Sequence, residues 1–435
     1  MVNLCIALEA IIIICFIIKN NIYKGKIILD HILCFSVGYV YYGLLPLFLF
    51  QNKISFADTI YNRMEDIFQQ ISEKQKIFYL LIMLFWLIAF YAGSTRKSIV
   101  FRNTRKIFRK EKDKITFIYS QKLFFILMII LGVFMLYLNR NSLLTGYISK
   151  HSSEYKGSLS AYVTMLFSMV LLYFLSIRKK NFKKASISKW GMAYIFFALM
   201  LLSMGGRLYV ISNIIALLIV FSMVYTDGIS IGKLIRITVI VLFIVGMIGV
   251  LRANMHAGIT FRQIAFNLLQ EPINTNYSLF TYLAYCDIGN WGSFPVVFVS
   301  SLINFIPRIF LPTKENYIKT VYNLQPNVKS PLGATQFFVS YNVDFGIIPT
   351  VLFLFVLGNF LAYLRKKNEN NNIISNTVYC MISSNLMFTF FRDGVMTSLV
   401  KNIMEFSFLV PIIIVYINAF LAKKTIRYNQ HINNH

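Results

Sequence analysis

Apolar runs close to twenty residues long recur along the whole chain, separated by short polar segments that are mostly basic. A helix needs about 20 predominantly apolar residues to cross the hydrocarbon core of a bilayer. The pattern therefore predicts an all-α polytopic integral membrane protein with about 11 transmembrane helices. We place the spans at residues 2–18, 28–50, 77–95, 117–138, 159–177, 190–204, 208–225, 235–251, 345–364, 373–391 and 397–421. We expect residues 1–435 to form a single transmembrane domain.

The basic residues indicate the orientation of these spans. The chain has 43 Lys and Arg against 17 Asp and Glu, a formal net charge of +26. More than half of the basic residues fall in the segments 19–27, 96–122, 178–189, 226–236, 365–372 and the tail from 422. Because cytoplasmic loops are enriched in Lys and Arg, we predict that these segments face the cytoplasm. Membrane topology and attraction to anionic lipids thus explain the charge, and nucleic acid is not an expected partner.

The longest external segment, residues 252–344, is predicted to be one large loop between spans 8 and 9. It is rich in aromatic residues and apolar stretches, so it is not a disordered linker, and we expect it to cap the helix bundle. The stretch Phe294 to Leu311 is apolar enough to suggest another span, but Pro295, Pro307 and Arg308 interrupt it. An amphipathic or re-entrant element on the outer membrane face is the better interpretation.

The stretch Ser203-Met204-Gly205-Gly206-Arg207 interrupts an apolar run from Trp190 to Tyr225. A charged residue at the centre of a spanning helix costs roughly 2.5–3.5 kcal/mol on insertion scales. The run therefore predicts two helices joined by a tight turn, which the glycines permit, with Arg207 at the turn. Because a helix over 190–204 is only about 22 Å long, we expect Arg207 to lie below the membrane surface, in a water-filled cavity.

Five arginines are predicted on the outer side of the membrane: Arg207, Arg252, Arg262, Arg308 and Arg392. A guanidinium group keeps its charge and binds phosphate oxygens in a bidentate manner, so such a set suits a lipid diphosphate. The alternative for Arg252 and Arg392 is that they cap helix ends or reach toward lipid phosphates. Asp393 is expected to pair with the neighbouring Arg392.

Four further residues are candidates for chemistry or sugar binding. His256 follows Arg252 by four residues, a helical spacing, and is a candidate proton acceptor or diphosphate contact, although a lone surface histidine is the commoner outcome. The carboxylate of Asp344 is a candidate for binding sugar or for taking the proton of an attacking hydroxyl, and Asp393 is an alternative for the same roles. Tyr341 and Trp291 are candidates for stacking on sugar rings, and the aromatic belts of membrane interfaces explain them equally well. The scattered His and Cys residues predict no metal site and no cofactor.

The adjacent carboxylates Glu65 and Asp66 lie in an early external loop. Such a pair is typical of membrane glycosyltransferases that use polyprenyl-monophosphate sugars. Charges of both signs surround the pair, however, which favours a solvated amphipathic helix, and we favour that interpretation.

Taken together, three features resemble the O-antigen polymerase (Wzy-type) family of oligosaccharide repeat-unit polymerases. The first is Gly205-Gly206-Arg207 between two mid-chain spans, and the second is the single large external loop at 252–344. The third is Gly333-Ala334-Thr335, followed by the aromatic cluster Phe338 to Tyr341 and by Asp344-Phe345-Gly346 at the start of a span.

The resemblance implies a metal-independent glycosyltransferase of polysaccharide or lipopolysaccharide biosynthesis, in the bacterial inner membrane, whose active site faces the periplasm. The enzyme would transfer a growing glycan from undecaprenyl diphosphate onto a new undecaprenyl-diphosphate-linked repeat unit. Clustered arginines would stabilise the charge of the departing diphosphate. In this scheme Arg207, Arg252 and His256 are the catalytic candidates, and a chain-length regulator protein is an expected partner.

Three other functions compete with this one. An O-antigen ligase, which transfers glycan to a lipid core, is a near neighbour in fold and the closest competitor. A lipid-linked oligosaccharide flippase would also be polytopic and basic, but the sequence lacks the repeated halves typical of such transporters. A polyprenyl-monophosphate-sugar-dependent glycosyltransferase would rest on Glu65 and Asp66.

Arg207→Ala is expected to abolish glycan chain extension while the protein still accumulates in the membrane. A charge in such apolar surroundings is costly and is kept where it has a function, and the substitution removes that charge. The measurement is gel analysis of surface glycan length in a deletion strain carrying the variant. Normal chain lengths would remove Arg207 from the site.

Overall fold

The computed structural model describes residues 1–23, 25–54, 59–95, 122–143, 159–176, 189–204, 206–225, 228–236, 261–286, 296–303, 334–368 and 372–433, with the single residues 239, 311 and 313. By internal contacts the chain divides into two compact units, which we describe separately. Unit 1 comprises Met1–Thr95, Thr226–Phe360 and Asn385–Lys401, and unit 2 comprises Arg96–Tyr225, Leu361–Ser384 and Asn402–His435. The expected single domain stays a prediction.

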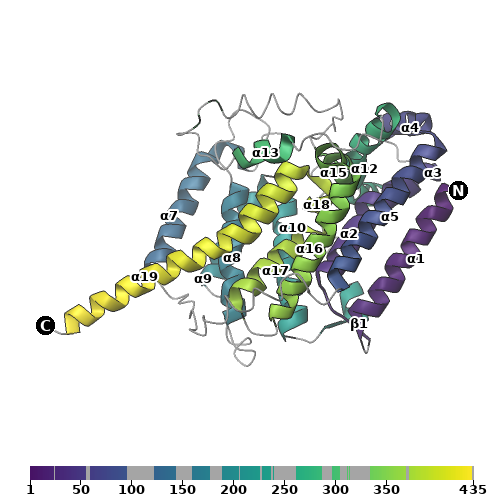
Figure 1. Cartoon of the computed structure of the whole chain (residues 1–435). Helices are drawn as coiled ribbons and strands as arrows, with labels where there is room; N and C mark the ends of the chain where they lie inside the picture. Colours follow the sequence, from purple (N-terminus) through teal and green to yellow (C-terminus); the bar gives the residue numbers. More distant parts are fainter. Residues whose placement is uncertain are drawn as a thin grey trace. The chain divides into compact units, whose positions relative to one another are not determined.

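Unit 1 contains most of the long helices (Figure 1). Its elements are α1 (Val2–Asn21), β1 (Ile22–Tyr23), β2 (Lys26–Ile27), α2 (His31–Tyr39), the π-helix η1 (Val40–Leu44), α3 (Leu45–Gln51), α4 (Thr59–Gln70), α5 (Glu73–Thr95), β3 (Ile229–Ser230), α12 (Phe261–Tyr285), α13 (Val296–Ile303), α15 (Phe337–Phe345) and α18 (Thr389–Arg392). The helices α16 (Ile347–Asn368) and η7 (Met396–Leu409), a π-helix, begin in unit 1 and end in unit 2.

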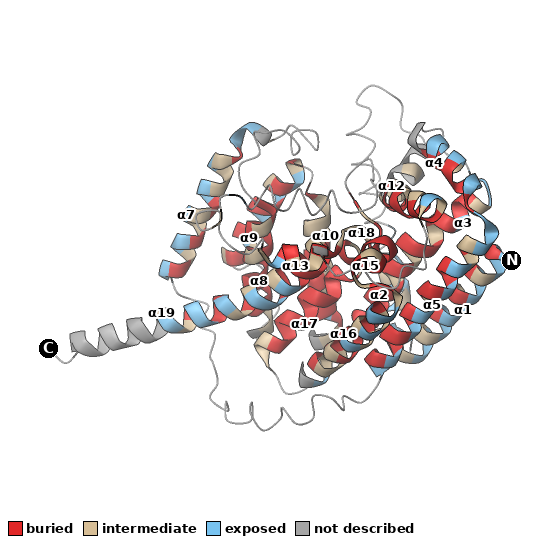
Figure 2. Ribbon diagram, turned by 45° about the horizontal axis from the view of Figure 1, so that its top comes forward, coloured by how far each residue is buried: buried red, intermediate tan, exposed pale blue. Residues whose placement is uncertain are grey.

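The protein is an α-helical membrane protein. Among the described residues, five helices are long and apolar enough to cross a membrane: Val2–Asn21, His31–Gln51, Glu73–Thr95, Ile347–Lys366 and Met396–Leu421. The first of them, α1, shows why these helices suit lipid. It buries one narrow stripe that includes Val2, Ile6 and Ile13, and most of its remaining apolar surface is exposed (Figure 2). A soluble protein would hide that surface from water.

Helices occupy each predicted span except 235–251, which lies mostly outside the described residues. Two spans differ from their expected form. The predicted span 373–391 is two helices, α17 (Ile373–Asn385) and α18, because the chain leaves the helical path after Asn385. The predicted span 397–421 begins as the π-helix η7 and continues as α19 (Val410–Asn433). Of the apolar stretch at 294–311, the described part is α13, whose eight residues give about 12 Å, too short to cross a bilayer.

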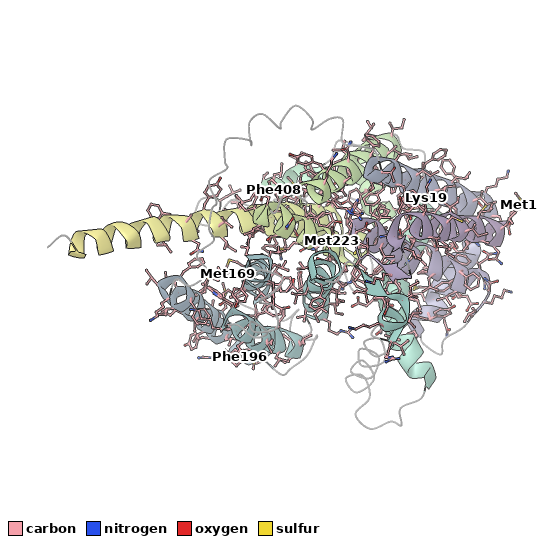
Figure 3. The ribbon with its side chains drawn as sticks, turned by 90° about the horizontal axis from the view of Figure 1, so that it is seen from below. Met1, Lys19, Met169, Phe196, Met223 and Phe408 are labelled. Atoms are coloured by element: carbon pink, nitrogen blue, oxygen red, sulfur yellow. The ribbon has the colours of Figure 1, made fainter. Side chains whose placement is uncertain are left out.

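A small three-stranded antiparallel sheet marks one end of unit 1, and its strands are the only ones among the described residues. Lys26 pairs with Ser230, and Ile27 pairs with Ile229. The sheet therefore joins the segments 19–27 and 226–236, both predicted to face the cytoplasm, at the same end. Figure 3 looks onto this end, where Lys19 of the last turn of α1 is labelled. The sequence did not predict the sheet, since two-residue strands leave no periodic pattern.

The opposite end of unit 1 collects segments that were predicted to be external. The helix α4 packs on α12, with the ring of Phe68 at 5.0 Å from that of Phe280. The hydroxyl of Tyr285 also donates a hydrogen bond of 2.9 Å to Gln70 of α4. Figure 1 shows α4, α12, α13 and α15 at the end away from β1. The two groups of loops in unit 1 thus lie at opposite ends, as the charge pattern requires.

The core of unit 1 is aromatic. Phe35 of α2 stacks on Phe90 of α5 at 3.9 Å between ring centroids. Phe337 of α15 lies 5.0 Å from Phe390 of α18, and all four side chains are fully buried. Large rigid rings contribute burial together with pairwise contacts worth about 0.5–1.5 kcal/mol each. This core joins α2, α5, α15 and α18, and the turn that follows α18 is anchored through that helix.

Unit 2 is built around α8 (Leu159–Ser176). Its other helices are α7 (Lys122–Leu138), the short 3₁₀ helix η3 (Arg140–Ser142), α9 (Lys189–Ser203), α10 (Arg207–Val220), the π-helix η6 (Phe221–Tyr225), α17 and α19. The ring of Tyr162 on α8 packs against Phe197 of α9, with 5.2 Å between centroids. The preceding residue of α9, Phe196, is exposed, as a lipid-facing residue would be (Figure 3).

Gly93 of α5 and Gly358 of α16 allow two helix backbones in unit 1 to approach closely. A Cβ atom on Gly93 would lie 2.1 Å from the carbonyl oxygen of Phe355, and one on Gly358 would lie 2.5 Å from that of Phe90. Small residues at such crossings are the usual means of packing helices in lipid, where apolar burial alone provides little attraction.

Gly93→Ala is expected to lower the free energy of unfolding of the purified protein in detergent by about 1–3 kcal/mol, because the backbone of α16 must move away. Gly232→Ala is the matched control, since a Cβ atom there meets nothing within 4 Å. Thermal unfolding of both variants checks this. Equal midpoints for Gly93→Ala, Gly232→Ala and the unaltered protein would contradict it.

Candidate functional site

Two irregular backbone segments meet in unit 1, at the π-helix η1 and at Pro272 within α12. Proline lacks an N–H group, so the carbonyl of Leu268, four residues earlier, has no helical donor there. The hydroxyl of Tyr41 in η1 donates to that carbonyl instead. Asn276 donates through Nδ2 to the carbonyls of Tyr42, at 2.7 Å, and of Pro272, at 2.8 Å. Side chains of each segment thus satisfy backbone groups that the other segment's irregularity leaves open.

Arg392, at the end of α18, lies between two carboxylates beside this junction. Its Nη1 donates to Oδ1 of Asp393 at 3.2 Å, and its Nε lies 3.8 Å from Oε2 of Glu271 on α12. The three side chains are partly exposed, at 19% for Arg392, 15% for Asp393 and 27% for Glu271. The pairing of Arg392 with Asp393 was predicted and is confirmed, whereas Glu271 was not predicted. Partly exposed ion pairs contribute about 0–1 kcal/mol to stability, so folding alone gives little reason for this arrangement.

A buried hydroxyl belongs to the same junction. The side chain of Tyr42 is completely buried, and its hydroxyl has no hydrogen-bond partner among the described residues. Its ring lies 6.5 Å from that of Phe388, four residues before Arg392. Leaving a buried hydroxyl unpaired costs about 1–3 kcal/mol, so a ligand that accepts this hydrogen bond would recover that free energy. We call Tyr42, Glu271, Arg392 and Asp393 the Arg392 cluster.

The turn that bears Arg392 is held on both sides. A Cβ atom on Gly38 of α2 would lie 2.5 Å from the ring of Phe391, so only glycine lets α18 approach α2 this closely. After the turn, the backbone N–H of Val395 donates to Oγ of Ser340 at 2.7 Å. The guanidinium group is therefore carried by a rigid segment, as a binding site requires.

The cluster combines a cation, two carboxylates and a hydroxyl donor. Carboxylate oxygens accept hydrogen bonds from hydroxyl groups and take up protons, and a guanidinium binds anionic oxygens. One cation against two anions suits a polyhydroxylated ligand better than a diphosphate alone. Among the described residues, no group of three or more His, Cys, Asp or Glu side chains is placed to hold a metal ion.

Tyr341 and Asp344, predicted to bind glycan, are both buried in unit 1. The carboxylate of Asp344 accepts hydrogen bonds from the backbone N–H groups of Val297, at 3.2 Å, and Phe298, at 2.9 Å. Asp344 thus caps the N-terminus of α13. The ring of Tyr341 packs among aromatic side chains, including Phe337 at 4.7 Å. These contacts hold the fold together, and a role of either residue in glycan binding stays a prediction.

Arg207 belongs to unit 2 and is the first residue of α10. The expected pair of helices is confirmed, since α9 ends at Ser203 and α10 begins at Arg207. Gly206 precedes α10, and its N–H donates to the carbonyl of Leu201 at 3.0 Å. The hydroxyl of Ser203, suggested as a partner of Arg207, donates to the carbonyl of Met200 in its own helix at 2.7 Å.

The remaining candidates divide into two groups. Those outside the described residues are Arg252, His256, Trp291 and Arg308, and the side chain of Arg262 on α12 is not described either. Glu65 and Asp66 lie on α4, an amphipathic helix that buries Tyr61, Met64 and Phe68 and exposes Asp66. The amphipathic-helix interpretation of that carboxylate pair is confirmed.

Glu271 escaped the sequence analysis because its partner is far away along the chain. A glutamate before a proline, in an otherwise mixed segment, resembles an ordinary helix break. Only the packing of α12 against α18 and η1 brings it to Arg392.

No family model matches the chain, and neither curated proteins nor solved structures gave a match. The resemblance to the O-antigen polymerases therefore stays a hypothesis carried by the residues of this chain.

Asp344 predicts a pH dependence of stability. Burial raises the pKa of its carboxyl from 3.8 to about 6, against the opposing effect of two backbone N–H groups. The folded chain therefore binds this proton more tightly than the unfolded chain does. The resulting stabilisation, on the order of 3 kcal/mol, is complete below pH 4 and is lost as the pH rises through 6.

Thermal unfolding of the unaltered protein and of Asp344→Asn between pH 4 and pH 7 measures this effect. The midpoint of the unaltered protein, relative to that of the variant, should fall over this interval, because the amide does not titrate. A difference in midpoint that stays constant with pH would show that the folded carboxyl keeps its usual proton affinity.

Proposed function

We propose that this protein is a polysaccharide repeat-unit polymerase of the bacterial inner membrane, with its active site on the periplasmic face. A hydroxyl of the acceptor's terminal sugar attacks the anomeric carbon of the donor glycan. The bond between that carbon and the diphosphate oxygen breaks, and undecaprenyl diphosphate leaves with the bonding electron pair. The acceptor is a single repeat unit on the same lipid carrier, so each turnover lengthens one glycan by one unit.

One observation carries this proposal: the three charged residues of the Arg392 cluster, Glu271, Arg392 and Asp393, lie in segments predicted to be external. The positive-inside rule assigns the sheet end of unit 1, with Lys19 and Lys26, to the cytoplasm. The cluster is supplied by α12, η1 and the turn after α18, and α12 packs on α4 at the other end. On this assignment its carboxylates and its guanidinium face the periplasm, where glycan assembly on a lipid diphosphate takes place.

The full architecture of the proposal has 11 transmembrane helices and a periplasmic loop at 252–344 between spans 8 and 9. The loop contributes α12 and α13, and the α12 segment carries Glu271 toward Arg392. Arg252, Arg262 and Arg308 are proposed to bind the diphosphate with Arg392, and Arg207, which belongs to unit 2, is a separate candidate that the sequence suggests. A diphosphate that is already an activated leaving group needs charge stabilisation more than it needs a metal. Binding both lipid-tethered substrates at one site orients the acceptor hydroxyl toward the anomeric carbon of the donor.

Arg392→Ala is expected to lower the rate of chain extension roughly 100-fold or more, as for the loss of one group that stabilises developing charge. The measurement is the length distribution of surface glycan in a deletion strain that expresses each variant at equal membrane abundance. Arg63→Ala is the matched control, because Arg63 is an exposed arginine on α4 at the same end of unit 1. It should leave the distribution unchanged.

The deletion strain itself separates this function from its nearest competitor. Without a polymerase, the surface acceptor should still carry one repeat unit, because ligation is intact. Without a ligase, it should carry none. Absence of the single-unit product in the deletion strain would end the polymerase proposal, whatever the phenotype of Arg392→Ala.

A further inference from the structure

We propose that Glu271 is the base that takes the proton from the attacking hydroxyl of the acceptor sugar. This inference rests on the proposed function and names a catalytic residue that the sequence had not suggested, in place of His256. It starts from the two carboxylates of the Arg392 cluster, which differ in how they are held.

Asp393 is committed to Arg392. Its Oδ1 accepts a hydrogen bond of 3.2 Å from Nη1, and it is the less exposed of the two carboxylates. Glu271 instead lies 3.8 Å from Nε of Arg392, which is an ion-pair distance longer than a hydrogen bond. Its side chain is also the most exposed of the three charged groups. The greater exposure of Glu271 favours it as the carboxylate that meets a substrate hydroxyl, while Asp393 orients the guanidinium.

The position of Glu271 is set by the backbone rather than by a flexible loop. It directly precedes Pro272 in α12, and Thr275 donates through Oγ1 to the Glu271 carbonyl at 2.8 Å. The hydroxyl of Tyr41 and the amide of Asn276 join this part of α12 to η1. A base that must lie within hydrogen-bond distance of one hydroxyl benefits from such support.

The hydroxyl of Tyr42 adds a donor to the proposed site. It is buried and has no partner among the described residues, and the carbonyl of the same residue accepts the hydrogen bond from Asn276 that joins η1 to α12. A phenol donates as well as accepts, so it can hydrogen-bond to an oxygen of the same sugar whose hydroxyl meets Glu271. The ligand that the cluster selects is thus a sugar with adjacent oxygens, presented by the acceptor.

The proposed step balances as follows. The acceptor hydroxyl oxygen forms a bond to the donor's anomeric carbon while its proton passes to a carboxylate oxygen of Glu271. The carbon–oxygen bond to the diphosphate breaks, and its electron pair stays on the diphosphate oxygen. Glu271 then releases the proton to water. Arg392 remains charged throughout and faces the anionic oxygens that develop.

The experiment compares Glu271→Gln, Glu271→Asp and Tyr42→Phe in the deletion strain, with Glu73→Gln as the matched control. Glu73 is an exposed glutamate at the start of α5, in the same unit. Loss of a general base typically slows a reaction by about 10²–10⁴-fold. We expect Glu271→Gln to stop at the single-unit product, Glu271→Asp to extend chains partially and Glu73→Gln to extend them fully.

Tyr42→Phe separates binding from folding. Removal of an unpaired buried hydroxyl should leave the thermal midpoint unchanged or raise it, while chain extension falls. A lower midpoint together with normal extension would assign Tyr42 to the fold and would remove the second support for the site.

If Glu271→Gln proves unstable, Glu271→Ala decides the matter, with sodium formate supplied in the medium as an external carboxylate. Restoration of chain extension by formate supports the base. Failure of formate to restore extension identifies a structural ion pair and overturns the inference, as does full activity of Glu271→Gln. In either case, extension by the unaltered protein keeps the proposed function. If the unaltered protein also fails to extend chains, the function itself fails.

Discussion

The hydrogen bonds from side chains to backbone carbonyls that join η1 to α12 are the constraint on which the candidate site depends. A bilayer offers no partner for an open carbonyl or N–H group, so a membrane protein tolerates an irregular backbone only where protein groups satisfy it. The π-helix at Val40–Leu44, within the candidate span His31–Gln51, is such an irregularity, and the proline in α12 leaves a second carbonyl open beside it. Tyr41 and Asn276 satisfy carbonyls across the junction. The same bonds that make these segments permissible fix Glu271 beside Arg392.

Charge separates the two ends of unit 1. The sheet end carries lysines on the segments that enter it, and the opposite end gathers α4, α12 and the turn after α18. In the second group the basic residue Arg392 is balanced by carboxylates rather than left to face lipid head groups. This balance is what distinguishes a site from a topological signal. A lysine that merely marks the cytoplasmic side needs no partner, whereas Arg392 has two carboxylates beside it.

Buried polar residues in this protein fall into two kinds. Asp344 is fully engaged, since both carboxylate oxygens accept backbone N–H groups at the start of α13. Tyr42 is equally buried, but its hydroxyl has no partner among the described residues. Residue type alone does not separate the two. Asp344 caps a helix, and its expected role in glycan binding stays a prediction. Tyr42 was not singled out by the sequence.

The sequence by itself located the long apolar helices, because crossing a bilayer demands long apolar runs and the loops between them must hold the charges. It did not locate α12 and α15, which fall in the segment predicted to be a loop. It did place the break between α9 and α10, where Arg207 follows a glycine, and the pairing of Arg392 with its neighbour Asp393. Tertiary structure decided the small sheet, since its two-residue strands have no periodicity. It also decided the meeting of Glu271, Tyr42 and Arg392. Those residues come from three separate segments, and no local pattern records that packing will bring a glutamate of α12 to an arginine that follows it by more than a hundred positions.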